Sequence, residues 1–114
     1  MSATALKERL RADLQAAMQA KAAGEVRLLR TLIAALDNAE AVAVEQKGYV
    51  SRKFGDPSGE VPRLQLDDGA INQLLRGEIE ARTEAASDYE RHGEAAEAQR
   101  LRDEASLIAR YQAT

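Results

Sequence analysis

Residues 5–36 read ALKERLRADLQAAMQAKAAGEVRLLRTLIAAL, and this stretch decides the fold class. Its apolar side chains recur at intervals of three and four residues, which places them on one face of an α-helix. Gly24 interrupts the pattern, and glycine commonly ends a helix because it accepts a left-handed conformation. We therefore expect two helices joined by a short turn, which makes them antiparallel neighbours. The expected inner faces are Leu6, Leu10, Leu14, Ala17 and Met18 before the turn, and Val26, Leu29, Leu32, Ile33 and Leu36 after it.

The C-terminal half shows the helical pattern twice more. Asp67 can cap a third helix, which His92-Gly93 ends, and a fourth helix follows directly. Four helices with two tight turns and one long crossover predict an all-α, four-helix bundle-like fold, in a single domain over residues 1–114. The expected apolar positions are Ile71, Leu74, Leu75, Ile79, Ala86 and Tyr89 in the third helix, and Ala98, Leu101, Ala105, Ile108 and Tyr111 in the fourth.

Between about residues 45 and 66 the helical period is lost, and glycines and prolines punctuate the segment. Such a stretch is long for a connection inside a compact domain, so we expect either a functional loop or a tolerated insertion. Val50 and Val61 leave a short hairpin open as an alternative.

This loop also mixes basic and aromatic side chains, the combination by which proteins hold single-stranded nucleic acid. The candidate loop contacts are Lys47, Tyr49, Arg52, Lys53 and Phe54. Glu45, Asp56 and Glu60 flank them, and such a mixture in one short loop is also a common accident of composition.

The composition excludes several classes of protein. The sequence has no cysteine, which excludes disulfides, thiolate catalysis and thiolate metal sites. No apolar run approaches the ~20 residues that cross a bilayer, and charged residues occupy the N-terminal positions where a signal peptide is apolar. We therefore expect a cytoplasmic protein without membrane contact.

Charge is unevenly divided along the chain. Residues 1–65 contain ten Lys/Arg and eight Asp/Glu, whereas residues 66–114 contain six and eleven. A domain that wraps nucleic acid usually shows a basic face. Any nucleic-acid role is therefore expected to use the N-terminal part.

Four charged residues fall on the predicted inner faces or at their margin. Advancing by about 100° per residue places Glu40 in the stripe of the second helix and Arg30 at its margin. Glu78 and Arg82 fall on the stripe of the third helix and, being four apart, can pair along it. Because an unpaired buried charge is costly, we expect these residues to form an ionic cluster that fixes how the second and third helices dock. The alternative is that they reach water at an open rim.

No catalytic constellation is apparent, so we expect no catalytic residue, no cofactor and no metal. A serine nucleophile would need His92, the single histidine, as its base. His92 lies at a predicted helix end, where a cation interacts favourably with the helix dipole. Asp88 and His92 are spaced to share a metal ion, but a third ligand is missing.

Two stretches match the pattern of a known family. The first is residues 6–14, LKERLRADL, with Ala17-Met18, continuing into residues 29–40, LRTLIAALDNAE. The second is residues 78–82, EIEAR, followed by YERHG at 89–93 and RDEA at 102–105. Together they resemble the GatB/YqeY family over nearly the whole chain except residues 45–65.

The resemblance implies the N-terminal helical bundle of a YqeY-like protein, related to the C-terminal region of the tRNA-dependent amidotransferase B subunit. Those enzymes are carbon–nitrogen ligases with glutamine as amido-N-donor, and they amidate glutamate or aspartate on a mischarged tRNA. In them this region helps to engage tRNA, and the chemistry is done elsewhere. Arg30, Asn38, Glu40, Glu78 and Arg82 match positions of the family's motif, which implies a partner- or tRNA-binding site or a structural ionic cluster.

The family continues past a Tyr-Leu-Pro-like segment into a second small bundle, whereas this sequence reads YQAT at residues 111–114. The resemblance is therefore to the N-terminal bundle without the C-terminal tail bundle. The leading expectation is a non-catalytic domain that acts with tRNA or with an aminoacyl-tRNA amidotransferase. The alternative is a protein–protein interaction adaptor with no tRNA role, which docks a partner through its helix faces or the 45–66 loop.

Overall fold

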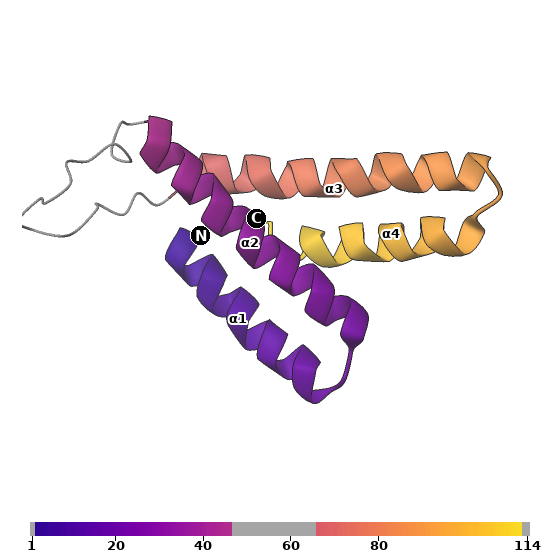
Figure 1. The fold of residues 1–114 in the computed structure, drawn as a ribbon, viewed down its shortest axis with the longest axis horizontal. Helices are drawn as coiled ribbons and strands as arrows, with labels where there is room; N and C mark the ends of the chain where they lie inside the picture. Colours follow the sequence, from indigo (N-terminus) through magenta and orange to yellow (C-terminus); the bar gives the residue numbers. More distant parts are fainter. Residues whose placement is uncertain (1, 47–65, 113–114) are drawn as a thin grey trace, which may run out of the picture. The chain divides into compact units, whose positions relative to one another are not determined.

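The computed structural model describes residues 2–46 and 66–112, and within them the chain is all-α (Figure 1). The four helices are α1 (Ala3–Gln19), α2 (Ala23–Gln46), α3 (Asp68–Arg91) and α4 (Ala95–Ala109). The predicted all-α class with four helices is confirmed. The predicted loop contacts Lys47, Tyr49, Arg52, Lys53 and Phe54, and the alternative hairpin, lie outside the described residues.

Two compact units divide the chain, residues 1–68 and residues 69–114. The first contains the antiparallel pair α1–α2 and the second the antiparallel pair α3–α4 (Figure 1). The single domain over residues 1–114 stays a prediction. Every helix in the described residues is too short or too polar to traverse a lipid bilayer.

The α1–α2 pair buries leucines from both helices. Ser2 caps α1, because its side chain accepts a hydrogen bond from the backbone N–H of Ala5 at 3.0 Å. The buried apolar side chains are Ala3, Leu6, Leu10 and Ala17 on α1, and Leu28, Leu29, Leu32 and Leu36 on α2.

The buried stripe of α2 differs from the predicted one. Leu28 is buried, whereas Val26 and Ile33 are half-buried. Apolar residues cover so much of this helix that two stripes satisfy the helical period, and the observed one is rotated toward Leu28. Met18 was predicted to face the core but is 45% exposed, because it lies in the last turn of α1 beside the connection to α2.

The turn between α1 and α2 is closed by Lys21 rather than by Gly24. Lys21 has a φ of 56°, and its N–H donates to the carbonyl of Met18 at 3.1 Å. The N–H of Ala22 donates to the carbonyl of Ala17 at 2.9 Å, which completes a Schellman motif. The prediction that Gly24 ends the first helix is therefore wrong, since Gly24 lies in the first turn of α2.

The turn between α3 and α4 has the same motif with the expected residue. Gly93 has a φ of 76°, and the N–H of Glu94 donates to the carbonyl of Tyr89 at 2.8 Å. The prediction that His92-Gly93 ends the third helix is confirmed. Ala86, Ala98 and Leu101 form a buried cluster against which Ala85 packs.

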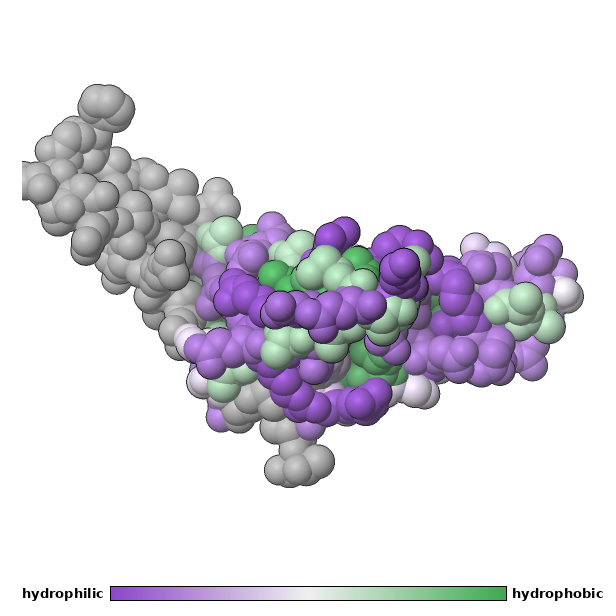
Figure 2. All heavy atoms as spheres, turned by 90° about the horizontal axis from the view of Figure 1, so that it is seen from below, coloured by the Kyte–Doolittle hydropathy of each residue, from purple (hydrophilic) through white to green (hydrophobic). Residues whose placement is uncertain are grey.

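Most other predicted positions of this pair are also buried. Ile71, Leu75, Ala105, Ile108 and Tyr111 are buried, whereas Leu74 and Ile79 are half-buried. Tyr89 is 41% exposed although its spacing places it on the apolar side, because it lies in the last turn of α3, next to the connection. Figure 2 shows a surface on which hydrophilic side chains dominate and apolar ones form smaller patches between them.

Candidate functional site

Glu40, one of the predicted cluster residues, pairs with Lys7 of α1. The Lys7 ammonium forms ion pairs with the Glu40 carboxylate and, at 2.9 Å, with Asp37. Burial opposes the charged form of Lys7, but the hydrogen bonds to Glu40 and Asp37 outweigh this effect and raise its pKa. This contact connects α1 to α2, and sequence reasoning missed Lys7 because no local spacing links it to Glu40 on another helix.

Glu78 and Arg82 pair along α3, as their spacing predicts, and Arg82 also reaches α4. The guanidinium donates to the Glu78 carboxylate at 3.1 Å, to the Glu78 carbonyl at 3.0 Å and to the Glu104 carboxylate at 3.0 Å. Glu104 in turn accepts from Arg100 at 2.8 Å. Arg82 is thus held by two carboxylates and a carbonyl, which makes it a structural link between α3 and α4.

The outer end of this network lies on α4. Arg100 donates to Glu97 through two nitrogens, at 2.8 and 2.9 Å. The hydrogen bond from Arg100 lowers the pKa of Glu97, and the same bond raises the pKa of Arg100. Glu97, Arg100 and Glu104 all lie on α4, and solvent screens these exposed pairs, so they add little to the stability of the fold.

The partners of the predicted cluster therefore lie within each helical pair. Glu40 is held by α1, and Glu78 and Arg82 are held along α3 and by α4. Asn38 and Arg30 are exposed. The docking of the second helix on the third through these residues stays a prediction.

His92 lies close to Asp88, but its ring contacts the backbone carbonyl of Asp88 and not the carboxylate. His92 Nδ1 lies 2.7 Å from the carbonyl oxygen of Asp88, whose carboxylate pairs with Arg91. Within the described residues no group of three His, Cys, Asp or Glu side chains is placed to hold a metal ion.

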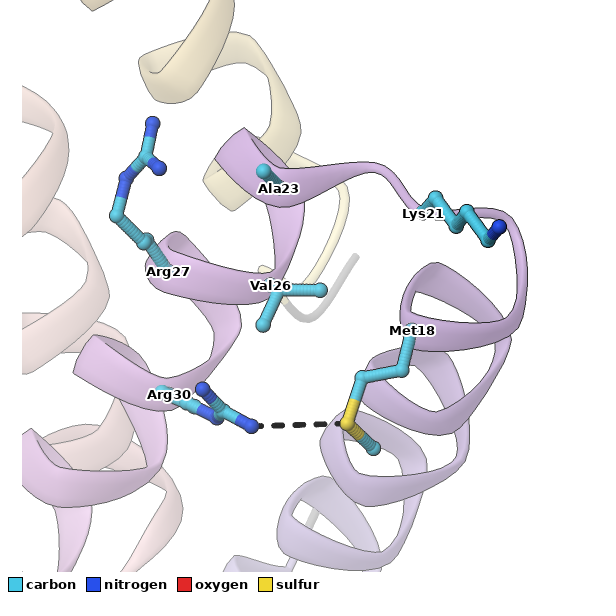
Figure 3. Close-up of a pocket in the computed structure, with 6 residues that line it drawn as sticks. All are labelled: Met18, Lys21, Ala23, Val26, Arg27 and Arg30. Carbon is cyan, nitrogen blue, oxygen red and sulfur yellow. Dashed lines mark hydrogen bonds between the residues drawn. The ribbon is translucent and has the colours of Figure 1, made fainter.

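A shallow hollow of about 430 Å³ lies where α1 turns into α2. Arg30 and Met18 point toward one another across it, and Val26 projects between the two helices (Figure 3). The Arg30 guanidinium donates to the Met18 sulfur at 3.6 Å. The lining residues are Met18, Lys21, Ala23, Val26, Arg27 and Arg30.

The charged side chains that line this hollow are all positive, and we call it the cationic hollow. Its described lining contains three cations and no carboxylate. Within the described residues, Lys21, Arg27 and Arg30 form no ion pair, and the thioether that Arg30 contacts is a weak, neutral acceptor. Five cations elsewhere are held by carboxylates, namely Lys7, Arg82, Arg91, Arg100 and Arg102, whereas Arg11 and Arg76 also form no ion pair within the described residues. The hollow therefore has unneutralised positive charge available for an anionic ligand.

Sequence reasoning found Arg30 but missed Lys21 and Arg27. Arg27 and Arg30 are three apart and share a side of α2, which was visible in the sequence. Lys21 joins them because the turn closes at its own position, which the expected stop at Gly24 concealed.

Comparison with known proteins finds no family model and no curated protein that matches this chain.

Proposed function

We propose that the chain is a non-catalytic binding domain of the GatB/YqeY type, whose α1–α2 pair contacts the phosphate groups of tRNA. The observation that carries the proposal is the cationic hollow, which Lys21, Arg27 and Arg30 line without a carboxylate partner. Phosphate contacts by Lys and Arg supply most of the sequence-independent affinity for nucleic acid. The resemblance to the family supplies the expectation that the nucleic acid is tRNA.

The distribution of charge supports contact through the first pair. Residues 2–46 contain six Lys/Arg and six Asp/Glu, whereas residues 66–112 contain six and eleven. In the second pair Arg82 and Arg100 are also held by carboxylates, so they are less available to phosphates. A polyanion is therefore attracted more strongly to the first pair.

Binding to bulk tRNA as a function of salt tests this proposal. If three cations each neutralise one phosphate, affinity should fall roughly twenty- to fortyfold between 50 and 200 mM salt, since each contact releases most of one counterion. Fluorescence anisotropy of labelled tRNA measures the dissociation constant across this range. No binding at low salt would contradict the proposal and leave the protein–protein adaptor as the remaining expectation.

A further inference from the structure

We infer that the cationic hollow holds one unpaired nucleotide, with its phosphate on Arg30 and its base against Met18 and Val26. The inference rests on the proposed function for the choice of RNA and goes beyond it in naming the state of the RNA. Contact with duplex phosphates needs only an exposed cationic face. This hollow has apolar walls beside its cations, and burying those walls is favourable only against an apolar group.

The apolar walls favour unpaired over paired nucleotides. In an RNA duplex the base faces are stacked on one another, and a protein meets mainly phosphates and 2′-hydroxyls. Met18, Ala23 and Val26 would then face polar groups and gain nothing from burial. An unpaired base presents a free face, which packs on apolar groups, on a methionine sulfur or on an arginine plane.

Arg30 is placed to contact both parts of such a nucleotide. Its guanidinium lies within hydrogen-bonding distance of the Met18 sulfur and points across the hollow (Figure 3). A guanidinium binds phosphate through its edge and stacks on a base through its face. Lys21 from the turn and Arg27 from α2 line the hollow, and their charged ends extend away from it on opposite sides, where they can meet the neighbouring phosphates of a strand (Figure 3).

The size and hydrogen-bonding character of the hollow also favour a nucleotide as its ligand. A volume of about 430 Å³ lies in the range of small-ligand sites, roughly 300–1,000 Å³. Its polar side chains are lysine and arginine, which donate hydrogen bonds but cannot accept them. An acidic peptide would bring N–H donors that find no side-chain acceptor stronger than the Met18 thioether there, whereas a phosphodiester presents acceptors. The hollow is open, so the base edges stay in water, and little preference among bases is expected.

The experiment measures direct binding of labelled RNA to the full chain by fluorescence anisotropy at low salt. A ten-nucleotide oligouridylate is compared with a duplex of ten base pairs and with bulk tRNA. The oligouridylate should bind about tenfold more tightly than the duplex. Met18→Gln and Val26→Thr should each weaken oligouridylate binding about fivefold, while Val42→Thr, the same change at an exposed position of α2, should not. Circular dichroism checks that each variant is folded.

The outcomes separate the inference from the proposed function. If tRNA binds but the oligouridylate does not, or if the duplex binds equally well, the inference is overturned and the proposed function stands. If the oligouridylate binds as expected but tRNA does not, the inference stands and the proposed function fails. An acidic, leucine-containing peptide that displaces the oligouridylate at equal concentration would also overturn the inference, as would Met18→Gln and Val26→Thr variants that bind like the unmodified protein.

Discussion

Two residues with the same backbone conformation show how local strain is distributed in this chain. Lys21 and Gly93 both follow the last turn of a helix, both have positive φ, and both close a Schellman motif. Glycine adopts this conformation freely, whereas an L-residue with a side chain pays about 1–2 kcal/mol for it. The α1–α2 turn is therefore strained at the residue that contributes a cation to the hollow. We interpret the lysine as a side chain that serves binding at the expense of stability.

Replacing Lys21 tests this interpretation. Lys21→Gly should raise the free energy of unfolding by about 0.5–1 kcal/mol, since relief of the left-handed strain exceeds the added entropy of the unfolded glycine. Lys21→Ala removes the charge but keeps the Cβ atom, so it should not stabilise. Gly93→Ala introduces the same strain at the other turn and should lower the free energy by about 1 kcal/mol. Urea unfolding measures the free energy of unfolding of all three variants. An equal gain in stability for Lys21→Ala and Lys21→Gly would contradict the interpretation that Lys21 is strained.

At the scale of elements, α1 is connected to α2 by the contact of Lys7 with Glu40 and Asp37. Lys7 and Glu40 are each 16% exposed, so solvent screens their attraction only in part. The pKa of Lys7 is raised above its ordinary value of 10.5. A raised pKa means that the folded chain binds the proton more tightly than the unfolded chain does. The contribution of Lys7 to stability is therefore complete below about pH 10 and is lost as pH rises through the folded pKa.

Stability at alkaline pH tests this contact. Lys7→Met should lower the free energy of unfolding at pH 8 by about 0.5–1 kcal/mol, and its difference from the unmodified protein should shrink above about pH 10.5. Lys7→Arg stays protonated throughout this range, so it should not show the alkaline loss. Urea unfolding between pH 8 and pH 11.5 provides the measurement. A difference between Lys7→Met and the unmodified protein that is constant with pH would show that Lys7 acts through packing alone.

The helices could be predicted from the sequence because periodicity, caps and the Gly93 turn all indicate the same structure. Which face of α2 is buried could not be predicted, because Val26 and Leu28 are both apolar and periodicity does not choose between them. The partners of Arg82 could be predicted only along α3. Glu104 lies on another helix, and no local spacing connects the two. The cationic hollow was missed for a similar reason, because its lining depends on a left-handed Lys21 that sequence rules assign to glycine.

At the scale of the whole molecule, the two helical pairs differ in what their charges do. In the α3–α4 pair carboxylates outnumber cations, and a network from Glu78 to Glu97 holds Arg82 and Arg100. In the α1–α2 pair the numbers of acidic and basic residues are equal. Even so, Lys21, Arg27 and Arg30 form no ion pair with a carboxylate at the end of the pair where α1 turns into α2. We therefore propose that the first set of charges holds the helices of its own pair and that the second set binds a ligand.

Reversing the charge of Arg30 tests this assignment most directly. Arg30→Glu is compared with Arg11→Glu, which makes the same change at an exposed position of α1 outside the lining of the hollow. Anisotropy of labelled tRNA at several salt concentrations gives the affinity and its salt dependence, and circular dichroism confirms folding. Arg30→Glu should weaken tRNA binding at least about tenfold and reduce the salt slope by about one, whereas Arg11→Glu should change affinity less than about threefold. Equal losses for the two variants, or unchanged binding by Arg30→Glu, would contradict the account.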